Sequence, residues 1–393
     1  MRPLEGLRVL DLTRLVAGGF SGMLLADFGA EVVKVEQPGV GDPLRTWTNE
    51  GRPFWWKVYG RNKKYVTLNI TSPEGKAMFK SMVPTFDVMF DSFVPGTMER
   101  WNLGWDVIHA LHPGLVWLRI SGWGQTGPGS NRPGFGTLVE AATGMAAMTG
   151  EKDGPPLLPS FPIGDMVSGL YACNAIMFAL YHRDHHNGEG QMIDVALFES
   201  LFSLLGPLPA EYAATGKVRL RQGSRSKNSG PRGVYQTSDG EWIAVSGSTP
   251  KMAETFMTSY GLGDLLQDER FATNEARVLH AAELDPAIET AIGKLTLAEN
   301  LEIIDKNKLT AIHVQTIADI ERDPHWQARQ LTVDVPDAED SVRMHNVFPR
   351  LSGTPGEIRW PGGDSASNTD EFYMQQFGLT EEQVKELHEK GVI

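Results

Sequence analysis

The sequence predicts an α/β fold built on a parallel sheet, together with a second and smaller domain. Two observations carry this prediction. Short runs of β-branched and apolar residues alternate with helical patterns over the first 125 residues, which is typical of a parallel sheet covered by helices. The chain also has 393 residues, too many for one ordinary hydrophobic core. We therefore expect two domains of unequal size.

The expected strands follow one another at residues 7–12, 31–35, 65–70, 87–90 and 115–120. The last strand is apolar throughout, as a strand buried on both faces should be. Between the first two strands, the glycines of residues 17–22 predict a turn that leads into a helix ending near Gly29. The most apolar window, Met166 to Tyr181, is shorter than the roughly 20 residues that span a bilayer. We interpret it as a buried core helix.

Charge and cysteine content exclude several classes of protein. Net charge is −13, from 49 acidic and 36 basic residues, which disfavours nucleic-acid binding and requires a local basic site for any anionic ligand. The single cysteine, Cys173, excludes an internal disulfide framework and a cysteine-rich metal site. Residues 1–6 lead directly into a strand pattern, unlike a signal peptide. We expect a cytoplasmic protein that binds no metal, nucleic acid or membrane.

The start of the chain resembles a dinucleotide-binding fold, because glycines follow the first strand and the acidic residue Glu36 stands at the end of the second. The glycines read G-G-x-x-G, however, and lack the G-x-G-x-x-G spacing, which disfavours a nicotinamide cofactor. Neither a P-loop nor a G-x-S-x-G motif occurs, which lowers the odds of a nucleotide hydrolase or an α/β-hydrolase esterase.

Asp165 follows Gly164 and stands immediately before the long apolar helix. The simplest interpretation is an N-cap, because an Asp side chain at this place accepts a bond from an orphan backbone N–H. A carboxylate at this place can also act as a nucleophile. The residue types alone leave both interpretations open.

Short sequence motifs occur along nearly the whole chain. They are Pro3–Asp11, Leu25–Glu36, Gly41–Asp42, Arg61–Lys64, Ser72–Gly75, Ser121–Pro128, Gly164–Asp165, Gly188–Gln191 and Arg270–Asn274. In their order and spacing the chain resembles the family III CoA-transferases, the group that includes formyl-CoA:oxalate and carnitine CoA-transferases. Each motif is modest alone, and the set is highly specific.

The resemblance implies that Asp165 is the catalytic nucleophile. The enzyme would move CoA from an acyl-CoA donor to a free carboxylic acid through an aspartyl anhydride and then an aspartyl-CoA thioester. CoA thioesters are then substrates, and no cofactor is expected to be tightly bound. We favour a dicarboxylate as the acid. The sequence leaves open which donor and acceptor are used and whether transfer is intermolecular or intramolecular.

The resemblance also assigns binding residues to loops at the carboxyl ends of the strands. Those expected to bind CoA are Leu15, Val16, Ala17, Gln37, Leu68, Asn69, Phe93 and Arg100. Those expected to contact the substrate are Arg14, Gln125, Glu140, Gly164, Ser229 and Gly230. A surface ion pair is the alternative role of Arg100. Gln37 stands where relatives often carry Arg, which leaves phosphate recognition to cations such as Lys34 or Lys64.

The chain departs from the family pattern in two places. Relatives carry a Tyr-Asp or Tyr-Glu pair after the Pro-Gly of residues 133–134, where this chain has Gly136 and Thr137. Glu140, one helical turn later, either orients the site or is an ordinary packed helix acid. A glycine-only loop of the oxalate enzymes is replaced by the basic run Arg225–Arg232, preceded by Arg219 and Arg221. This run either receives the second carboxylate of a dicarboxylic acid or is a solvated linker.

Two other functions remain as alternatives. An α-methylacyl-CoA racemase needs two bases that flank the α-carbon, typically a His and an Asp. Racemases carry a Gly-His-Asp segment after the fifth strand, where this chain has Trp123–Pro128 without a histidine. The second alternative is a noncatalytic acyl-CoA-binding protein, which is favoured if Asp165 is only a helix cap.

The resemblance implies a Rossmann-like large domain with a parallel sheet, made from both chain ends, a smaller α+β domain, and an interlocked homodimer. We place the N-terminal part of the large domain at residues 1–205, with CoA binding and the catalytic Asp. A linker follows at 206–233, the small domain at 234–325, and the return linker with the rest of the large domain at 326–393.

Overall fold

The structure is a computed structural model of one chain, and it describes residues 1–338 and 340–393. The chain divides into two compact units. The first unit comprises Met1–Gly144, Pro159–Pro207 and Gln330–Ile393, and the second comprises Met145–Leu158 and Leu208–Arg329.

The segment Met145–Leu158 differs from our expectation, which placed it in the large domain. Within the second unit the N–H of Gly223 donates to the Gly150 carbonyl (2.9 Å), and Arg221 Nε donates to the Gly154 carbonyl (2.7 Å). Because these bonds join residues about 70 positions apart, no local sequence pattern could have predicted them.

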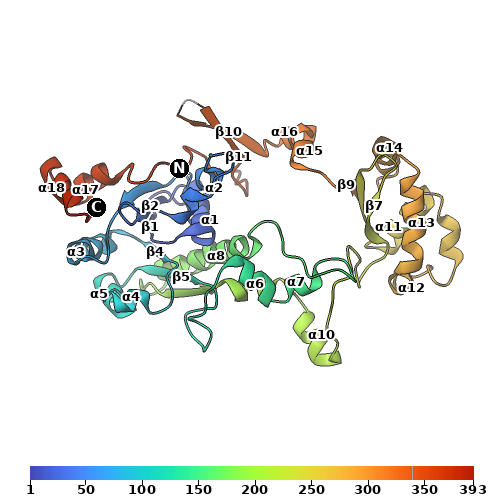
Figure 1. Cartoon of the computed structure of the whole chain (residues 1–393), viewed down its shortest axis with the longest axis horizontal. Coiled ribbons are helices and arrows are strands. Elements are labelled where there is room, and N and C mark those ends of the chain that lie inside the picture. The colour runs from blue at the N-terminus through green and yellow to red at the C-terminus, as the bar shows by residue number, and fades with distance from the viewer. Residues whose placement is uncertain (339) are drawn as a thin grey trace. The chain divides into compact units, whose positions relative to one another are not determined.

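A six-stranded parallel sheet forms the centre of the first unit, in the order β3-β2-β1-β4-β5-β6 (Figure 1). The strands are β1 (Arg8–Asp11), β2 (Glu31–Glu36), β3 (Lys64–Thr67), β4 (Val88–Asp91), β5 (Val116–Ser121) and β6 (Met192–Ala196). The order reverses between β1 and β4. In such sheets ligands bind in the crevice outside the carboxyl ends of the strands at this switch point.

Helices cover the sheet. Those of the first unit are α1 (Leu15–Asp27), η1 (Pro43–Thr46), α2 (Phe54–Tyr59), α3 (Pro73–Met82), η2 (Val83–Thr85), α4 (Thr97–Arg100), α5 (Trp105–Leu111), α6 (Gly136–Ala142), α8 (Ile163–His185), α9 (Leu197–Ser203), α17 (Thr369–Phe377) and α18 (Glu381–Glu389). The ribbon β10 (Thr332–Asp337) and β11 (Asp340–His345) is antiparallel. The C-terminal helices complete the core of the sheet, where Tyr373 is fully buried and donates to the Thr67 carbonyl (3.0 Å).

The glycine-rich segment of residues 17–22 lies inside α1, so the predicted turn is wrong. The glycines are needed for close packing. A Cβ on Gly18 would lie 2.1 Å from Thr13 Oγ1, and one on Gly22 would lie 2.8 Å from Lys63 Nζ. On the facing helix, a Cβ on Gly169 would lie 2.7 Å from the Phe20 ring. Tertiary contact therefore overrides the low helix propensity of glycine, which costs roughly 1 kcal/mol relative to alanine.

Helix α8 is longer than predicted and begins before Asp165. Its N-cap is Pro162, without a side-chain cap, and Asp165 lies in the first turn, so the N-cap interpretation of Asp165 is wrong. By length and composition alone α8 could cross a membrane. In the fold it packs against α1, α6 and α9, and Ser168, Ala172 and Ile176 are fully buried.

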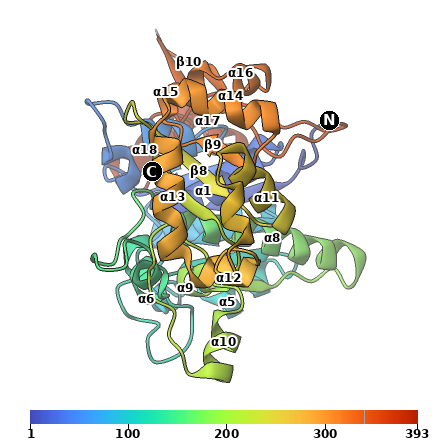
Figure 2. The same ribbon diagram turned by 90° about the vertical axis from the view of Figure 1, so that its right-hand side faces the viewer.

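The second unit holds a three-stranded antiparallel sheet in the order β7-β8-β9, from Arg232–Gln236, Trp242–Ser246 and Ala311–His313. Helices α11 (Pro250–Ser259), α13 (Ala281–Gly293) and α14 (Leu297–Asn307) lie beside it (Figure 2). The other helices are α7 (Met145–Met148), α10 (Leu208–Thr215), η3 (Gly263–Gln267), α12 (Asn274–Leu279), α15 (Ile317–Arg322) and α16 (Pro324–Ala328). The core includes Ile243, Phe256 and Ile288. The predicted α/β class is confirmed, with a parallel sheet and a separate small antiparallel sheet.

Candidate active site

Two neighbouring cavities open at the carboxyl ends of the strands in the first unit. The strand-end cavity, of about 130 Å³, is lined by the ends of β1, β2 and β3 and includes Gln37, Leu68 and Asn69. The Asp165 cavity, of about 610 Å³, includes Asp165, Leu15 and Ala17 together with the segment that follows β5. Arg14 and Phe93 line both cavities. Seven of the predicted binding residues thus line these two cavities, and four of them line the cavity that contains Asp165.

The remaining predicted residues do not line either cavity. Val16 is buried in a cluster with Leu44, Trp56 and Tyr65. Arg100 donates to Thr97 Oγ1 of its own short helix (2.7 Å).

Gln125 is held by its backbone, whose N–H donates to Asp194 Oδ2 (2.9 Å), and its Nε2 is buried without a partner in the part of the chain that the structure describes. Ser229 and Gly230 belong to the second unit, where the Gly230 N–H donates to Asn274 Oδ1 (3.2 Å). Their contact with the substrate stays a prediction.

The Asp165 carboxyl is partly buried, and its pKa is raised to about 6. Burial is the main cause, and the negative charge of Glu140 adds to it; the backbone N–H groups of Asp165 and Ala17 oppose the rise. Burial outweighs the favourable position of the carboxyl in the first turn of α8, so the pKa is raised. Asp165 is therefore a carboxylate that ionises near neutral pH and is poorly solvated.

Glu140 and Gly136 of α6 set the space around Asp165. Glu140 is only 2% exposed, and its Oε1 accepts a bond from the Gly164 N–H (3.1 Å). It is thus a packed helix acid that also holds the first turn of α8. A Cβ on Gly136 would lie 2.2 Å from Asp165 Oδ2, so only glycine leaves room for the carboxylate in this position.

The loop between β1 and α1 is held by a buried group of charges. Asp42 Oδ1 accepts the N–H of Leu15 (3.1 Å) and of Leu44 (2.9 Å), and Asp42 Oδ2 lies 2.9 Å from Lys34 Nζ. Leu15 has a positive φ of 64°. Gly41–Asp42 belongs to the motifs of the family resemblance, but the sequence assigned Asp42 no role.

Lys34 and Lys64, which we considered for phosphate recognition, are both paired with carboxylates. Burial disfavours the charge of Lys34, but Asp11 and Asp42 outweigh it and raise its pKa above the usual value. Lys64 Nζ lies 2.6 Å from Glu31 Oε1. Of the two, only Lys34 lines the strand-end cavity.

Asp91, at the end of β4, positions Phe93 and was not recognised in the sequence. Its Oδ1 accepts the Phe93 N–H (3.0 Å), and its Oδ2 accepts the Trp117 indole N–H (2.7 Å). Burial raises the pKa of Asp91 to about 6, although Arg119 lies 3.3 Å away and acts in the opposite direction. The only sequence signal was an acid at the end of an apolar strand.

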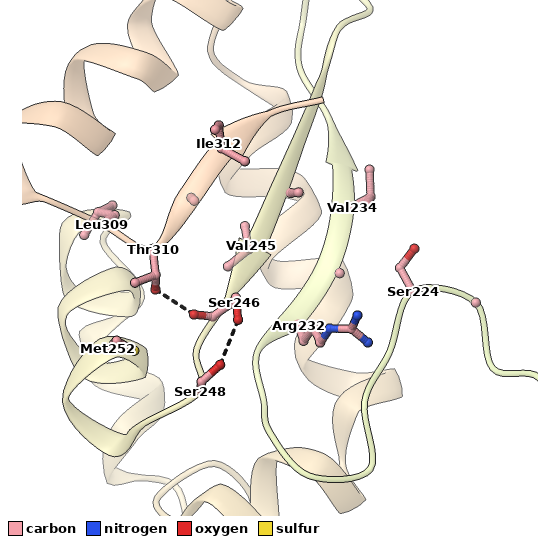
Figure 3. A pocket seen from close by; sticks show the side chains of 14 residues that line it. Ser224, Arg232, Val234, Val245, Ser246, Ser248, Met252, Leu309, Thr310 and Ile312 are labelled. Atoms are coloured by element: carbon pink, nitrogen blue, oxygen red, sulfur yellow. Dashed lines mark hydrogen bonds between the residues drawn. The ribbon is translucent and has the colours of Figure 1, made fainter. Parts of the chain in front are cut away.

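A third cavity, of about 850 Å³, lies on the sheet of the second unit (Figure 3). Thr310 Oγ1 donates to the Ser246 carbonyl (2.6 Å), and the hydroxyls of Ser246 and Ser248 are 2.8 Å apart. Among the described residues its lining includes no carboxylate and no histidine. It therefore lacks the groups for acid–base or carboxylate chemistry that the Asp165 cavity contains.

Comparison with known proteins agrees with the geometry. The model of the family described as "CoA-transferase family III" matches residues 4–364. A succinyl-CoA–D-citramalate CoA-transferase of Chloroflexus aurantiacus is 40% identical over 100% of this chain and 98% of its own. A succinate–glutarate CoA-transferase of Agrobacterium fabrum is 34% identical over 88% of each chain.

Among solved structures, a CAIB/BAIF family protein of Brucella suis matches with a TM-score of 0.84 and 30% identity, over 95% of this chain and 99% of its own. A protein of Mycobacterium tuberculosis matches with the same TM-score, identity and coverage. The chain is therefore a member of CoA-transferase family III.

Proposed function

We propose that this CoA-transferase moves CoA from a dicarboxylic acyl-CoA, such as succinyl-CoA, to a second dicarboxylic acid, with Asp165 as the nucleophile. The observation that carries the proposal is the place of Asp165, which is the one acid among the described residues that line its cavity. The relatives support the substrate class, because their names pair succinyl-CoA or succinate with citramalate and glutarate.

The reaction proceeds in four steps that conserve CoA. An Asp165 oxygen attacks the thioester carbonyl and expels the CoA thiolate, which gives a mixed anhydride. The thiolate then attacks the Asp165 carbonyl carbon, which releases the donor acid and leaves an aspartyl-CoA thioester. The acceptor carboxylate attacks that thioester and forms a second anhydride. The freed thiolate finally attacks the acceptor carbonyl, and Asp165 is regenerated.

The environment of Asp165 suits this role. A carboxylate with an ordinary pKa of about 3.9 is a weak nucleophile. The pKa of about 6 makes Asp165 more basic and still leaves it largely ionised at pH 7. Among the described residues no Lys or Arg nitrogen lies within 4.0 Å of its carboxylate. The attacking oxygen therefore keeps its charge undiminished by an ion pair.

The racemase alternative receives less support. It needs a second base across the α-carbon, and the described lining of the Asp165 cavity has no histidine, while Glu140 is bound to the Gly164 N–H. A noncatalytic role also becomes weaker, because Asp165 is not the N-cap of α8.

We further propose that the protein acts as an interlocked homodimer in the cytoplasm. Supporting this, α8 leaves apolar side chains at its surface, with Phe178 72% and Tyr181 63% exposed. A large exposed apolar face usually marks an interface. Sedimentation of a stable, folded monomer would contradict the dimer.

Mass spectrometry of the protein after incubation with succinyl-CoA tests the nucleophile. We expect a CoA adduct on the peptide that carries Asp165. Asp165→Asn should lose the adduct and lower turnover by about 10³-fold or more, since one member of the covalent machinery is removed. Binding of free CoA should persist and serves as the control for folding. Exchange that survives in Asp165→Asn, or epimerisation of a branched acyl-CoA without any adduct, would overturn the proposal.

A further inference from the structure

Two arginines that line the Asp165 cavity have no carboxylate partner among the described residues. The charged residues of its lining are Arg14, Arg132 and Asp165. Within the described part of the chain, no carboxylate oxygen lies within 4.0 Å of either guanidinium. In a protein of net charge −13, two unpaired arginines in one cavity form a local site for an anion.

The loop that carries Arg132 is fixed to the sheet rather than free. The Trp123 indole N–H donates to the Pro133 carbonyl (3.0 Å), and the Arg132 N–H donates to the Gly129 carbonyl (3.0 Å). A Cβ on Gly122 would lie 2.5 Å from the Gly134 Cα, so two glycines bring the loop backbone against the end of β5. The backbone at Arg132 is thereby held at the wall of the cavity, and the Arg132 side chain is exposed.

Arg14 is fixed in a different way and at a different place. Its backbone N–H donates to Ser92 Oγ (3.0 Å), and its guanidinium carbon lies 5.8 Å from the centre of the Phe93 ring. Arg14 lines both cavities, whereas Arg132 lines only the one that contains Asp165. The two arginines therefore differ in position. Arg14 lies where the two cavities share a wall, and Arg132 lies only in the Asp165 cavity.

We propose that Arg132 binds the free carboxylate of the dicarboxylic acyl group, with Arg14 contributing from the junction of the cavities. This inference rests on the proposed function of Asp165. A planar guanidinium can form two parallel hydrogen bonds to a carboxylate, which fixes both the position and the orientation of the acid. One such site serves donor and acceptor alike, because both acids pass through an anhydride formed with the same Asp165 carboxyl group.

The site predicts selectivity against monocarboxylic acids. A substrate that lacks the second carboxylate displaces water from Arg132 without replacing the lost hydrogen bonds. Sites built to bind a polar group reject analogues that lack it, because their own polar groups are left unpaired. Arg132 would thus determine specificity while taking no part in bond making.

The test compares two unreactive thioethers of CoA that differ in one group. S-(3-carboxypropyl)-CoA carries the free carboxylate, and S-butyl-CoA carries a methyl group in its place. Calorimetry with Arg132→Gln should show a loss of about 10- to 100-fold in affinity for the carboxypropyl ligand, the range expected for a hydrogen bond to a charged group. The affinity for S-butyl-CoA should stay within about twofold, which also shows that the variant is folded.

Two further variants complete the test. Arg132→Lys keeps the charge but not the fork, and it should recover part of the lost affinity. Arg322→Gln removes an exposed arginine of α15 and should change neither affinity. An equal loss for both ligands in Arg132→Gln would mean that Arg132 holds CoA itself, and unchanged affinity for both would also overturn the inference. Failure of the wild-type protein to transfer CoA from succinyl-CoA would refute the proposed function, and the binding comparison would still decide the role of Arg132.

Discussion

The two arginines of the Asp165 cavity and two arginines of the basic segment in the second unit, Arg219 and Arg225, look alike in sequence but differ in their partners. Arg219 lies 3.0 Å from Glu211, and Arg225 lies 2.6 Å from Asp285, which is 60 residues away. Arg14 and Arg132 have no such carboxylate among the described residues. A count of charges along the chain singles out the basic segment, where Arg221 and Arg232 donate only to backbone carbonyls. The unpaired arginines of the Asp165 cavity differ from these because they share their cavity with Asp165. Because Arg219 and Arg225 form ion pairs, these two residues do not fit the solvated linker that was one of our two interpretations of the segment.

The largest effect is expected where an arginine is both paired and fully buried. Arg61 Nη2 lies 2.6 Å from Asp27 Oδ2, and both side chains are at most 1% exposed. Arg61→Met should lower the free energy of unfolding by about 3–5 kcal/mol, because it leaves the Asp27 carboxyl buried without its cation. Urea denaturation measures this loss. A loss below about 1 kcal/mol would show that burial does not separate this pair from those of the second unit.

A smaller effect is expected from removing the negative charge beside Asp165. The folded-state pKa of Asp165 is about 6, above the ordinary value of 3.8. The raised pKa therefore stabilises the native state below about pH 4, and that contribution is lost as pH rises from about 4 to about 6. Only the ionised form attacks, so kcat/KM should fall below pH 6. Glu140→Gln should move this acid limb down by up to about one pH unit.

The pH profile of kcat/KM for Glu140→Gln, set beside that of the wild type, measures the shift. Thermal unfolding serves as the control, since the Gln side chain can still accept the Gly164 N–H. An acid limb that stays in place would show that burial alone raises the pKa of Asp165.

The smallest effect is expected in the basic segment. The Arg225 side chain is 40% exposed, and pairs of this kind contribute about 0.2–1 kcal/mol. Arg225→Gln should therefore lower stability by no more than this amount, and it should leave the ratio of affinities for carboxypropyl-CoA and butyl-CoA unchanged. A changed ratio would move the carboxylate site from the cavity to the basic segment and would reverse the comparison. Urea denaturation and calorimetry give the two readings.

The sequence predicted the parallel sheet well, because its signals are local. The strand predicted at residues 115–120 is observed at Val116–Ser121, and Val116, Trp117 and Leu118 are fully buried, as an all-apolar strand requires. The family prediction is confirmed as well. The glycine segment and the start of α8 were wrong, because contact between two helices decided them and no local pattern records it.

The candidate site was predicted in part. Asp165, Arg14 and Phe93 were chosen from the sequence and line one cavity. Asp91 was missed because its role depends on the Trp117 indole of the neighbouring strand, 26 residues away. Arg132 was missed because the absence of a partner is visible only after folding.

Asp42 gives the start of α1 an unusual property. A leucine in the left-handed region costs on the order of 1 kcal/mol or more, and such a conformation persists only where its surroundings enforce it. Here the bond from the Leu15 N–H to a carboxylate anchored on Lys34 enforces it. The backbone that presents Ala17 to Asp165 is consequently organised before any substrate arrives, so binding need not expend free energy on ordering it. This part of the site is therefore preorganised by the fold.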